Sequence, residues 1–180
     1  MRVFPENAAG LIIDLQDKLL PHIYNAKVLE ENCKKLITGL SILEIPMVAS
    51  EQYPKGLGPT IESIQNLIPD FKVVEKLSFS CCRDDNFRKV LRNIGKRMMI
   101  ICGVEAHVCV LQSAIDMVEI GYQPVIVEDC ISSRRESDKK TAIKRMIQEK
   151  VIVTSYESIL FELCLQAGTE TFKKISQLVK

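Results

Sequence analysis

Cys109 is the side chain in this sequence with the clearest potential for catalysis. An apolar run at residues 97–102 predicts a buried strand, and residues 103–106 interrupt it. Apolar residues then recur at helical spacing over residues 108–118, so the thiol lies in the predicted first turn of a helix. The free N–H groups and partial positive charge of a helix start favour thiolate, so we expect a lowered pKa for Cys109. The competing interpretation is a buried structural thiol, because the chain has seven cysteines.

Two charged residues stand at the ends of other predicted strands. Asp14 closes the apolar run 8–13, and Lys76 follows a short strand expected at residues 71–74. As a base, Asp14 could take a proton from the thiol or from water. A lysine at the same edge of a sheet would favour thiolate and hold the carboxylate in place. The alternatives are a carboxylate that accepts backbone N–H bonds from the next loop and a lysine in solvent.

These three residues meet only if the chain folds as a parallel sheet. Short apolar segments predict strands at residues 8–14, 45–49, 71–74, 97–102, 124–127 and 151–154. Periodic segments predict helices at 25–43, 60–67, 84–94, 108–120, 137–147, 155–163 and 170–179, with Asn25, Thr60, Asp84 or Asp85, Ser137 and Ser155 as expected caps. The alternation predicts a doubly wound α/β fold, a six-stranded parallel sheet with helices on both faces in a Rossmann-like three-layer sandwich. Ligands of such folds bind beyond the carboxyl ends of the strands, where the three candidates would lie.

Length and composition are those of an ordinary globular protein. We expect one domain over residues 1–180, with 47% hydrophobic and 26% charged residues. A net charge of +1 gives no reason to expect nucleic acid or a membrane surface as a partner. No apolar run approaches the roughly 18 residues of a membrane span. Residues 1–10 lack the apolar core of a secretory signal, so a cytoplasmic protein is expected.

The cysteines form no recognisable disulfide or metal framework. Four of them lie in or beside apolar segments, where a free thiol behaves as a small hydrophobe: Cys33, Cys102, Cys130 and Cys164. The adjacent pair Cys81-Cys82 rarely meets disulfide geometry. With no CxxC and only two histidines, the sequence predicts no zinc site, and the thiols are expected to be reduced. It also lacks GxGxxG, GxxxxGK[ST] and GxSxG, so dinucleotide, P-loop phosphate and serine-elbow sites are not indicated.

Three motifs together resemble a known family. They are IIDLQ at the end of the first strand, VEKLSFS after the third, and CGVEAHVCVLQSAIDMVEIGY around the thiol. The sequence resembles the isochorismatase-like cysteine hydrolases over essentially its whole length. The stretches SEQYPKGLGP and GVEAHVCVLQSA are most similar to the isochorismatase domain-containing subgroup.

The resemblance implies a catalytic triad of Asp14, Lys76 and Cys109. In related amidases the cysteine attacks a carbonyl, and water then releases the covalent acyl intermediate. The resemblance also implies a cis peptide between Val104 and Glu105, which would turn the Glu105 N–H, together with that of Cys109, toward the developing oxyanion. Relatives commonly form dimers or larger assemblies, so a homo-oligomer, a dimer or tetramer, is expected.

The sequence departs from two branches of this family. The nicotinamidase branch carries an Asp/His metal site after the second strand, but the loop SEQYPKGLGP has no histidine. We therefore expect no metal and no cofactor, and no nicotinamidase activity. True isochorismatases can lack the cysteine, so its presence at residue 109 argues against isochorismate as the substrate.

Five further residues are candidates for the substrate pocket by position. Gln16, Gln52 and Tyr53 lie in loops that follow the first two predicted strands, and side chains in solvent are the alternative. Phe79 could supply an apolar wall or belong to the core. His107 stands two residues before the thiol, and residues two apart on a helix do not face each other. We therefore expect His107 to line the pocket or an interface rather than to act as the base.

These observations predict a metal-independent cysteine hydrolase that acts on an amide-type C–N or an ester bond of a small molecule through a covalent Cys109 intermediate. Two alternatives remain open. One is a redox-responsive thiol protein, in which Cys109 or the pair Cys81-Cys82 is oxidised. The other is a binding module that has kept the fold without turnover.

Overall fold

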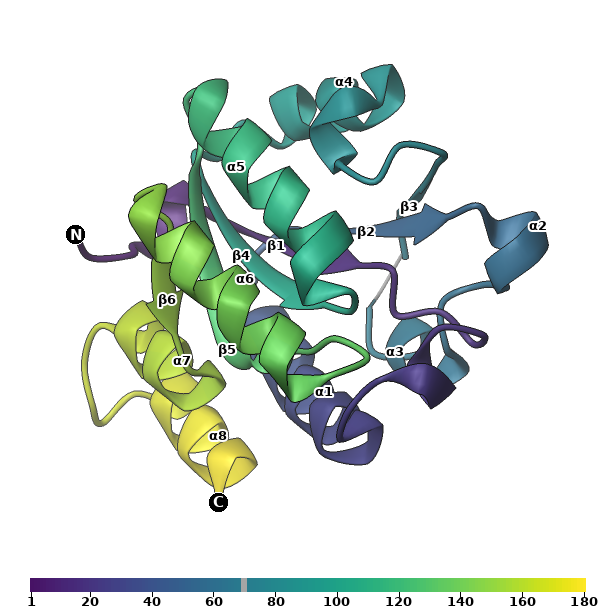
Figure 1. Ribbon diagram of the computed structural model, residues 1–180. Helices are drawn as coiled ribbons and strands as arrows, with labels where there is room; N and C mark the ends of the chain where they lie inside the picture. Colours follow the sequence, from purple (N-terminus) through teal and green to yellow (C-terminus); the bar gives the residue numbers. More distant parts are fainter. Residues whose placement is uncertain (69–70) are drawn as a thin grey trace.

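A parallel β-sheet forms the centre of the molecule (Figure 1). The computed structural model describes residues 1–68 and 71–180. The strands are β1 (Ala8–Ile13), β2 (Met47–Gln52), β3 (Val73–Lys76), β4 (Met98–Gly103), β5 (Gln123–Ile131) and β6 (Ile152–Thr154). Their order is β3-β2-β1-β4-β5-β6, and each neighbouring pair is parallel. The predicted six-stranded, doubly wound α/β architecture is confirmed.

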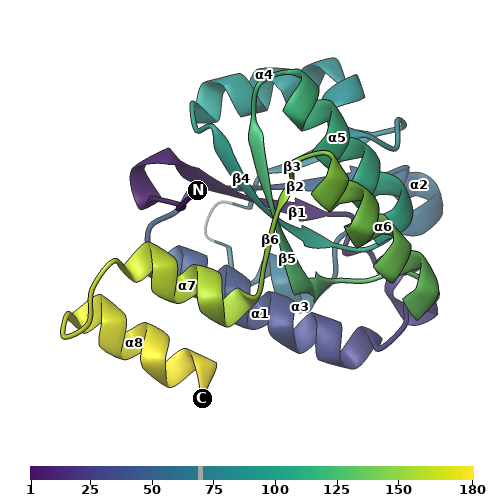
Figure 2. The ribbon, with the colours of Figure 1, turned by 60° about the vertical axis from the view of Figure 1, so that its left-hand side comes forward.

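Helices cover both faces of this sheet (Figure 2). One layer contains α4, α5 and α6, and the other contains α1, α7 and α8, with α8 packed on α1 and α7. Their bounds are α1 (Ala26–Ile42), α2 (Pro54–Leu57), α3 (Glu62–Gln65), α4 (Asp85–Ile94), α5 (Leu111–Glu119), α6 (Glu136–Gln148), α7 (Tyr156–Cys164) and α8 (Glu170–Val179). Short 3₁₀ turns lie at Pro5–Asn7, Leu20–His22 and Cys81–Arg83, and a π-helical turn at Ala106–Val110 leads into α5.

The central strands are apolar throughout because both of their faces are covered. In β1, Ala8 and Ile12 pack into the core beneath α1, whereas Leu11 and Ile13 pack into the core beneath α5. Residues of β4 alternate between the two cores in the same way. A parallel strand buried on both faces reads as a continuous apolar run, which is why periodicity located β1 and β4 within one residue.

The strand order reverses between β1 and β4, and their carboxyl ends meet at one point. The register pairs Ile13 with Gly103. Gly103 has φ +142°, and a Cβ atom there would lie 2.1 Å from the carbonyl oxygen of Ile13. Glycine is therefore required for β4 to end beside β1. Ligand sites of doubly wound sheets lie at such a reversal.

The second and third strands extend further toward the site than predicted. β2 ends at Gln52 rather than Ala49, and β3 ends at Lys76 rather than Val74. Gln52 and Lys76 are register partners in the sheet, so both are held by strand backbone instead of lying in loops. Their polar side chains hid these strand ends from an analysis based on apolar runs.

Two of the predicted helix caps are confirmed with their side-chain bonds, one occupies the cap position without such a bond, and two are wrong. The side chains of Asp84 and Ser155 accept the N–H groups of Phe87 and Ser158, at 2.9 and 3.3 Å. Asn25 precedes α1 without a side-chain capping bond, and α6 begins after Arg135 rather than Ser137. Thr60 forms an isolated antiparallel bridge with Gln16, and α3 starts two residues later.

Candidate active site

Asp14 lies directly after β1 in a left-handed conformation, with φ 54°. Aspartate tolerates this region better than most residues because its short side chain can bond locally. The carboxylate is fully buried and has two donors: Lys76 Nζ lies 2.8 Å from Oδ2, and Ser50 Oγ lies 2.7 Å from Oδ1. Asp14 is therefore held on both oxygens by side chains from β2 and β3.

Lys76 is buried together with its partner. Its Nζ donates to Asp14 Oδ2 and, at 2.9 Å, to Gln52 Oε1. Burial by itself would lower the pKa of Lys76, but the nearby Asp14, Cys81 and Cys109 and the hydrogen bond to Asp14 outweigh it, and the pKa is raised. The side chain is accordingly a charged ammonium at neutral pH. A buried ion pair needs such additional hydrogen bonds to compensate for desolvation.

Gln16 and Gln52 support this ion pair and are not side chains in solvent. Gln16 Oε1 accepts the backbone N–H of Gln52 at 2.8 Å, and Gln16 Nε2 donates to the carbonyls of Gln52 and Gly58 at 3.0 and 2.6 Å. Gln52 in turn donates from Nε2 to the carbonyl of Leu77 at 2.8 Å. Gln16 thus ties the loop after β2 to the end of β1, and Gln52 positions the ammonium of Lys76.

Cys109 lies in the π-helical turn before α5, and it lines a cavity of about 370 Å³. The cavity is lined by Leu19, Gln52, Leu57, Phe79, Glu105, His107, Val108, Cys109 and Arg134. Burial first, and then the Asp14 carboxylate, raise the pKa of the Cys109 thiol, while Lys76 lowers it by less. The expected lowered pKa is therefore wrong, because the helix start is buried and faces a carboxylate. The resting form at neutral pH is the thiol.

The structure brings together Asp14 directly after β1, Lys76 at the end of β3 and Cys109 in the π-helical turn before α5. The charge of Asp14 raises the pKa of the Cys109 thiol and the charge of Lys76 lowers it. Cys109 in turn raises the pKa of Lys76. Cys81 belongs to the same buried group: its N–H donates to Ser113 Oγ at 2.9 Å, and burial raises its pKa to about 11. A carboxylate, an ammonium and a thiol thus share one end of the sheet.

The turn before the thiol differs from the expected one. The Val104–Glu105 peptide is trans, so the implied cis bond is wrong. The chain turns through Gly103 and through Glu105, which is left-handed with φ 55° and ψ 54°. The Ala106 N–H then bonds the carbonyl of Ser132 at 2.9 Å. No acceptor for the Glu105 N–H occurs within residues 1–68 and 71–180, so this donor is free in the turn.

Sequence reasoning missed a polar cluster in the lining of this cavity, formed by Glu105, His107 and Arg134. Glu105 Oε1 accepts from Arg134 Nε at 2.7 Å, and His107 Nδ1 lies 3.0 Å from Ser133 Oγ. His107 and Phe79 both line this cavity. The SSRR segment is 29 residues from Glu105, and no local spacing signals that pairing. The bond from Ser50 to Asp14 is likewise a tertiary contact.

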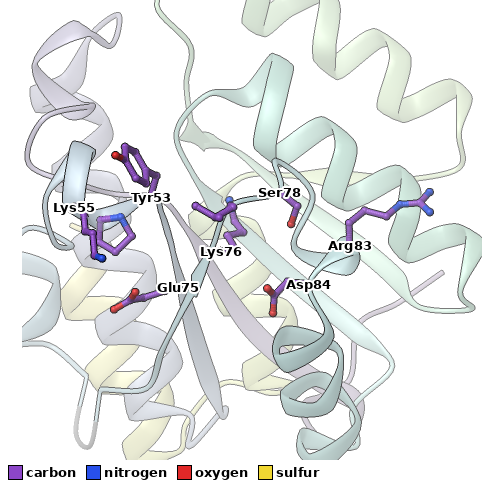
Figure 3. Close-up of a pocket in the computed structure, with 9 residues that line it drawn as sticks. Tyr53, Lys55, Glu75, Lys76, Ser78, Arg83 and Asp84 are labelled. Carbon is purple, nitrogen blue, oxygen red and sulfur yellow. The ribbon is translucent and has the colours of Figure 1, made fainter.

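Tyr53 lies in a different cavity from the thiol. That cavity, of about 560 Å³, runs along the edge strand β3 and is lined by Tyr53, Pro54, Lys55, Glu75, Lys76, Leu77, Ser78, Arg83 and Asp84. Figure 3 shows Tyr53, Lys55 and Glu75 on one side of Lys76, and Ser78, Arg83 and Asp84 on the other. Tyr53 therefore does not line the cavity that contains Cys109.

The described residues contain no cluster of three or more His, Cys, Asp or Glu side chains able to hold a metal ion. Among those residues, no helix is long and apolar enough to cross a membrane. All seven cysteines are free. Cys130 does not face the cleft; it is buried beside Cys33, whose Sγ lies 3.3 Å from the Cys130 carbonyl.

Comparison with known proteins places this geometry in a family. The isochorismatase domain model matches residues 8–158. Isochorismatase family protein 1B of Dictyostelium discoideum is 34% identical, over 99% of this chain and 89% of its own length. The structure named as MAR1 ribonuclease of Caenorhabditis elegans superposes with a TM-score of 0.93 at 33% identity, over 99% of this chain and 92% of that one.

A more distant structure shares the fold. The YcaC product of Escherichia coli, described as an octameric hydrolase of unknown specificity, superposes with a TM-score of 0.93 at 21% identity, over 99% of this chain and 90% of that one. Residues 8–158, which the isochorismatase domain model matches, include Asp14, Lys76 and Cys109. The chain therefore belongs to the isochorismatase family.

Proposed function

We propose that this protein is a metal-independent cysteine hydrolase that cleaves an amide-type C–N bond or an ester bond of a small molecule. The observation that carries the proposal is the Asp14 carboxylate, fixed by Lys76 at 2.8 Å and by Ser50 at 2.7 Å, at the sheet end where Cys109 lines a cavity. A buried carboxylate held next to a buried thiol is suited to proton transfer between them.

Acylation begins with the thiol, because the raised pKa of Cys109 keeps it protonated at rest. Asp14 takes the proton as Sγ attacks the carbonyl carbon of the substrate, and the C=O electron pair moves onto oxygen. When the tetrahedral intermediate collapses, the C–N or C–O bond breaks. The proton on Asp14 passes to the leaving nitrogen or oxygen, and a thioester to Cys109 remains.

Deacylation uses the same base. Asp14 takes a proton from water, the water oxygen attacks the thioester carbonyl, and the C–S bond breaks. The proton then returns to the sulfur, and a carboxylic acid is released. Lys76 stays charged throughout and holds the carboxylate in position. The N–H groups of Glu105 and Cys109 are the proposed donors to the oxyanion; removal of such a donor typically slows kcat by ~10²–10³.

A screen of small amides and esters tests the proposal. We expect the wild-type protein to hydrolyse at least one of them and Cys109→Ala to lose that activity by at least roughly 10³-fold, since the covalent route is removed. Cys164→Ala, which alters a half-buried thiol of α7, is the matched control and should retain activity. The appearance of a mass equal to protein plus acyl group marks the intermediate. Equal activity of wild type and Cys109→Ala would contradict the proposal.

The same screen includes the alternatives. An RNA substrate tests the activity for which the C. elegans structure is named; we expect none here, because a cavity of about 370 Å³ and a net charge of +1 do not suit a polyanionic chain. Peroxide treatment followed by intact-mass measurement tests the redox-responsive alternative, which predicts stable oxidation of Cys109 or Cys81-Cys82 at low doses.

The single domain over residues 1–180 and the homo-oligomer also remain proposals. Light scattering measures the oligomeric state.

A further inference from the structure

The Glu105 carboxylate is buried in the turn before Cys109, and one of its oxygens is sealed inside the protein. The residue is 6% exposed, and Oε2 has almost no accessible surface. Within the part of the chain that the structure describes, Oε2 has no hydrogen-bond partner, whereas Oε1 accepts from Arg134 Nε at 2.7 Å. A buried charge that is only half satisfied is costly, so its retention calls for an explanation. Because no ligand reaches Oε2, the explanation lies within the protein.

The backbone of the same residue adopts a conformation that needs support. Glu105 is left-handed, with φ 55° and ψ 54°, a region that residues other than glycine rarely adopt. Its N–H, which has no acceptor within residues 1–68 and 71–180, is one of the two proposed donors to the oxyanion. The side chain and this N–H belong to one residue, so an anchor on the carboxylate restricts the direction of the N–H. The carboxylate is therefore placed to hold a donor of the reaction in position.

The anchor comes from the loop that follows β5, and this loop also bonds the backbone on both sides of Glu105. The Ser132 N–H donates to the carbonyl of Gly103 at 3.3 Å, and the Ser132 carbonyl accepts the Ala106 N–H at 2.9 Å. Arg134 then fixes the side chain of the residue between them. Its cation also neutralises a carboxylate that would otherwise oppose a second negative charge formed nearby.

We propose that Arg134 and the Glu105 carboxylate form a positioning pair that holds the Glu105 N–H toward the oxyanion formed over Cys109. This inference rests on the function proposed above, because it assumes acyl transfer to Cys109. Arg134 acts through the carboxylate, and the carboxylate acts through its own backbone, so neither side chain takes part in making or breaking a bond. The pair serves the stabilisation of the oxyanion and not the removal of the proton from the thiol.

Two reagents that react with the same thiol separate these roles without a known substrate. With p-nitrophenyl acetate, Cys109 Sγ adds to the carbonyl carbon, an oxyanion forms, the C–O bond breaks, and the thiol proton passes through Asp14 to the p-nitrophenolate. With iodoacetamide, Sγ displaces iodide from the CH₂ carbon, and the thiol proton passes through Asp14 to solvent. Both reactions need access and proton removal, but only acylation forms an oxyanion. Intact mass and peptide mapping give the two rates at Cys109, and their ratio measures oxyanion stabilisation.

Glu105→Met and Arg134→Met each remove one partner of the pair. We expect each to lower the acylation-to-alkylation ratio by roughly 10- to 100-fold relative to wild type, the effect of a misplaced group on a reaction rate. Glu105→Met/Arg134→Met should match Glu105→Met, because Arg134 acts only through the carboxylate. Arg134→Lys keeps a donor for Oε1 and should retain more of the ratio than Arg134→Met. Arg135→Met, which alters the next exposed arginine, is the matched control and should leave the ratio unchanged.

The outcomes separate this pair from the hydrolase proposal. Arg134→Met leaves a buried carboxylate without its cation, so circular dichroism checks its folding. If it unfolds, Glu105→Met, which leaves no buried charge behind, decides the test. Acylation of wild-type Cys109 with an unchanged ratio in Glu105→Met overturns the positioning pair and leaves the hydrolase proposal standing, and an equal fall in Arg135→Met also overturns the pair. Alkylation of wild-type Cys109 without acylation overturns the hydrolase proposal, and the role of the pair fails with it.

Discussion

At the scale of single residues, the site depends on one buried carboxylate with two assigned partners. Asp14 Oδ2 bonds Lys76 and Oδ1 bonds Ser50, while Gln52 holds the same ammonium from the other side. The neighbouring Cys109 thiol is neutral at rest, since burial and the Asp14 carboxylate raise its pKa. In the proposed mechanism the carboxylate acts as the base, and the ammonium keeps it in place.

Replacement of Lys76 by Met should therefore damage both stability and chemistry. Removal of one partner from a buried ion pair leaves the other uncompensated, and we expect a loss of about 3–5 kcal/mol in the free energy of unfolding. Urea denaturation measures the stability, and acrylamide labelling of Cys109 measures the reactivity. Lys72→Met, four residues earlier and exposed, is the control, with a change within about 0.5 kcal/mol. A stability of Lys76→Met equal to that of Lys72→Met would contradict the buried pair.

At the scale of elements, the end of β4 decides where Cys109 lies. Gly103 pairs with Ile13 at the reversal of strand order, and the turn then passes through left-handed Glu105 into the π-helical segment. The sequence pattern predicted a strand, a sharp turn and a helix here, and these are present. It did not predict the trans peptide or the π-helical turn, because both depend on how the turn packs against Ser132 and Ile13.

Gly103→Ala tests this junction. A Cβ atom would meet the Ile13 carbonyl oxygen at 2.1 Å, so the two strands must separate at the active-site end. We expect a loss of more than about 3 kcal/mol in stability. Gly121→Ala is the matched control: its φ is also positive, at 87°, but nothing lies within 4 Å, so only the left-handed backbone penalty of about 1–2 kcal/mol applies. Thermal and urea unfolding compare the two, and equal losses would show that the close approach is unimportant.

At the scale of the whole molecule, buried thiols occupy both cores. Burial raises the pKa of Cys81 to about 11 and that of Cys82 to about 12, and it also raises the pKa of Cys130. A group whose pKa is higher in the folded state than in the unfolded one stabilises the fold below its unfolded pKa. That contribution is lost as the pH rises through the folded pKa.

The free energy of unfolding should therefore fall as the pH rises above about 9, the ordinary thiol value. For Cys81 alone, the shift from 9.0 to about 11 corresponds to roughly 2–3 kcal/mol lost by the upper end of that window. Urea denaturation between pH 8 and pH 11 measures the slope, and Cys81→Ala should make it shallower. A flat profile across this range would contradict the burial of these thiols.

The sequence by itself determined the alternation of strands and helices, the parallel sheet, the family motifs and the sheet edge at which Asp14, Lys76 and Cys109 lie. These follow from local periodicity, because a strand covered on both faces must be apolar along its length. It also placed His107 and Phe79 near the thiol by position alone.

The tertiary structure alone decided the protonation of the thiol and the partners of each polar group. Burial raises the pKa of Cys109, although the helix start by itself favoured thiolate. Gln16 and Gln52 support the ion pair, and Tyr53 lines another cavity. Arg134 bonds Glu105, which is 29 residues away in the sequence. Desolvation and hydrogen bonding depend on which atoms surround a group in space, and sequence spacing does not contain that information.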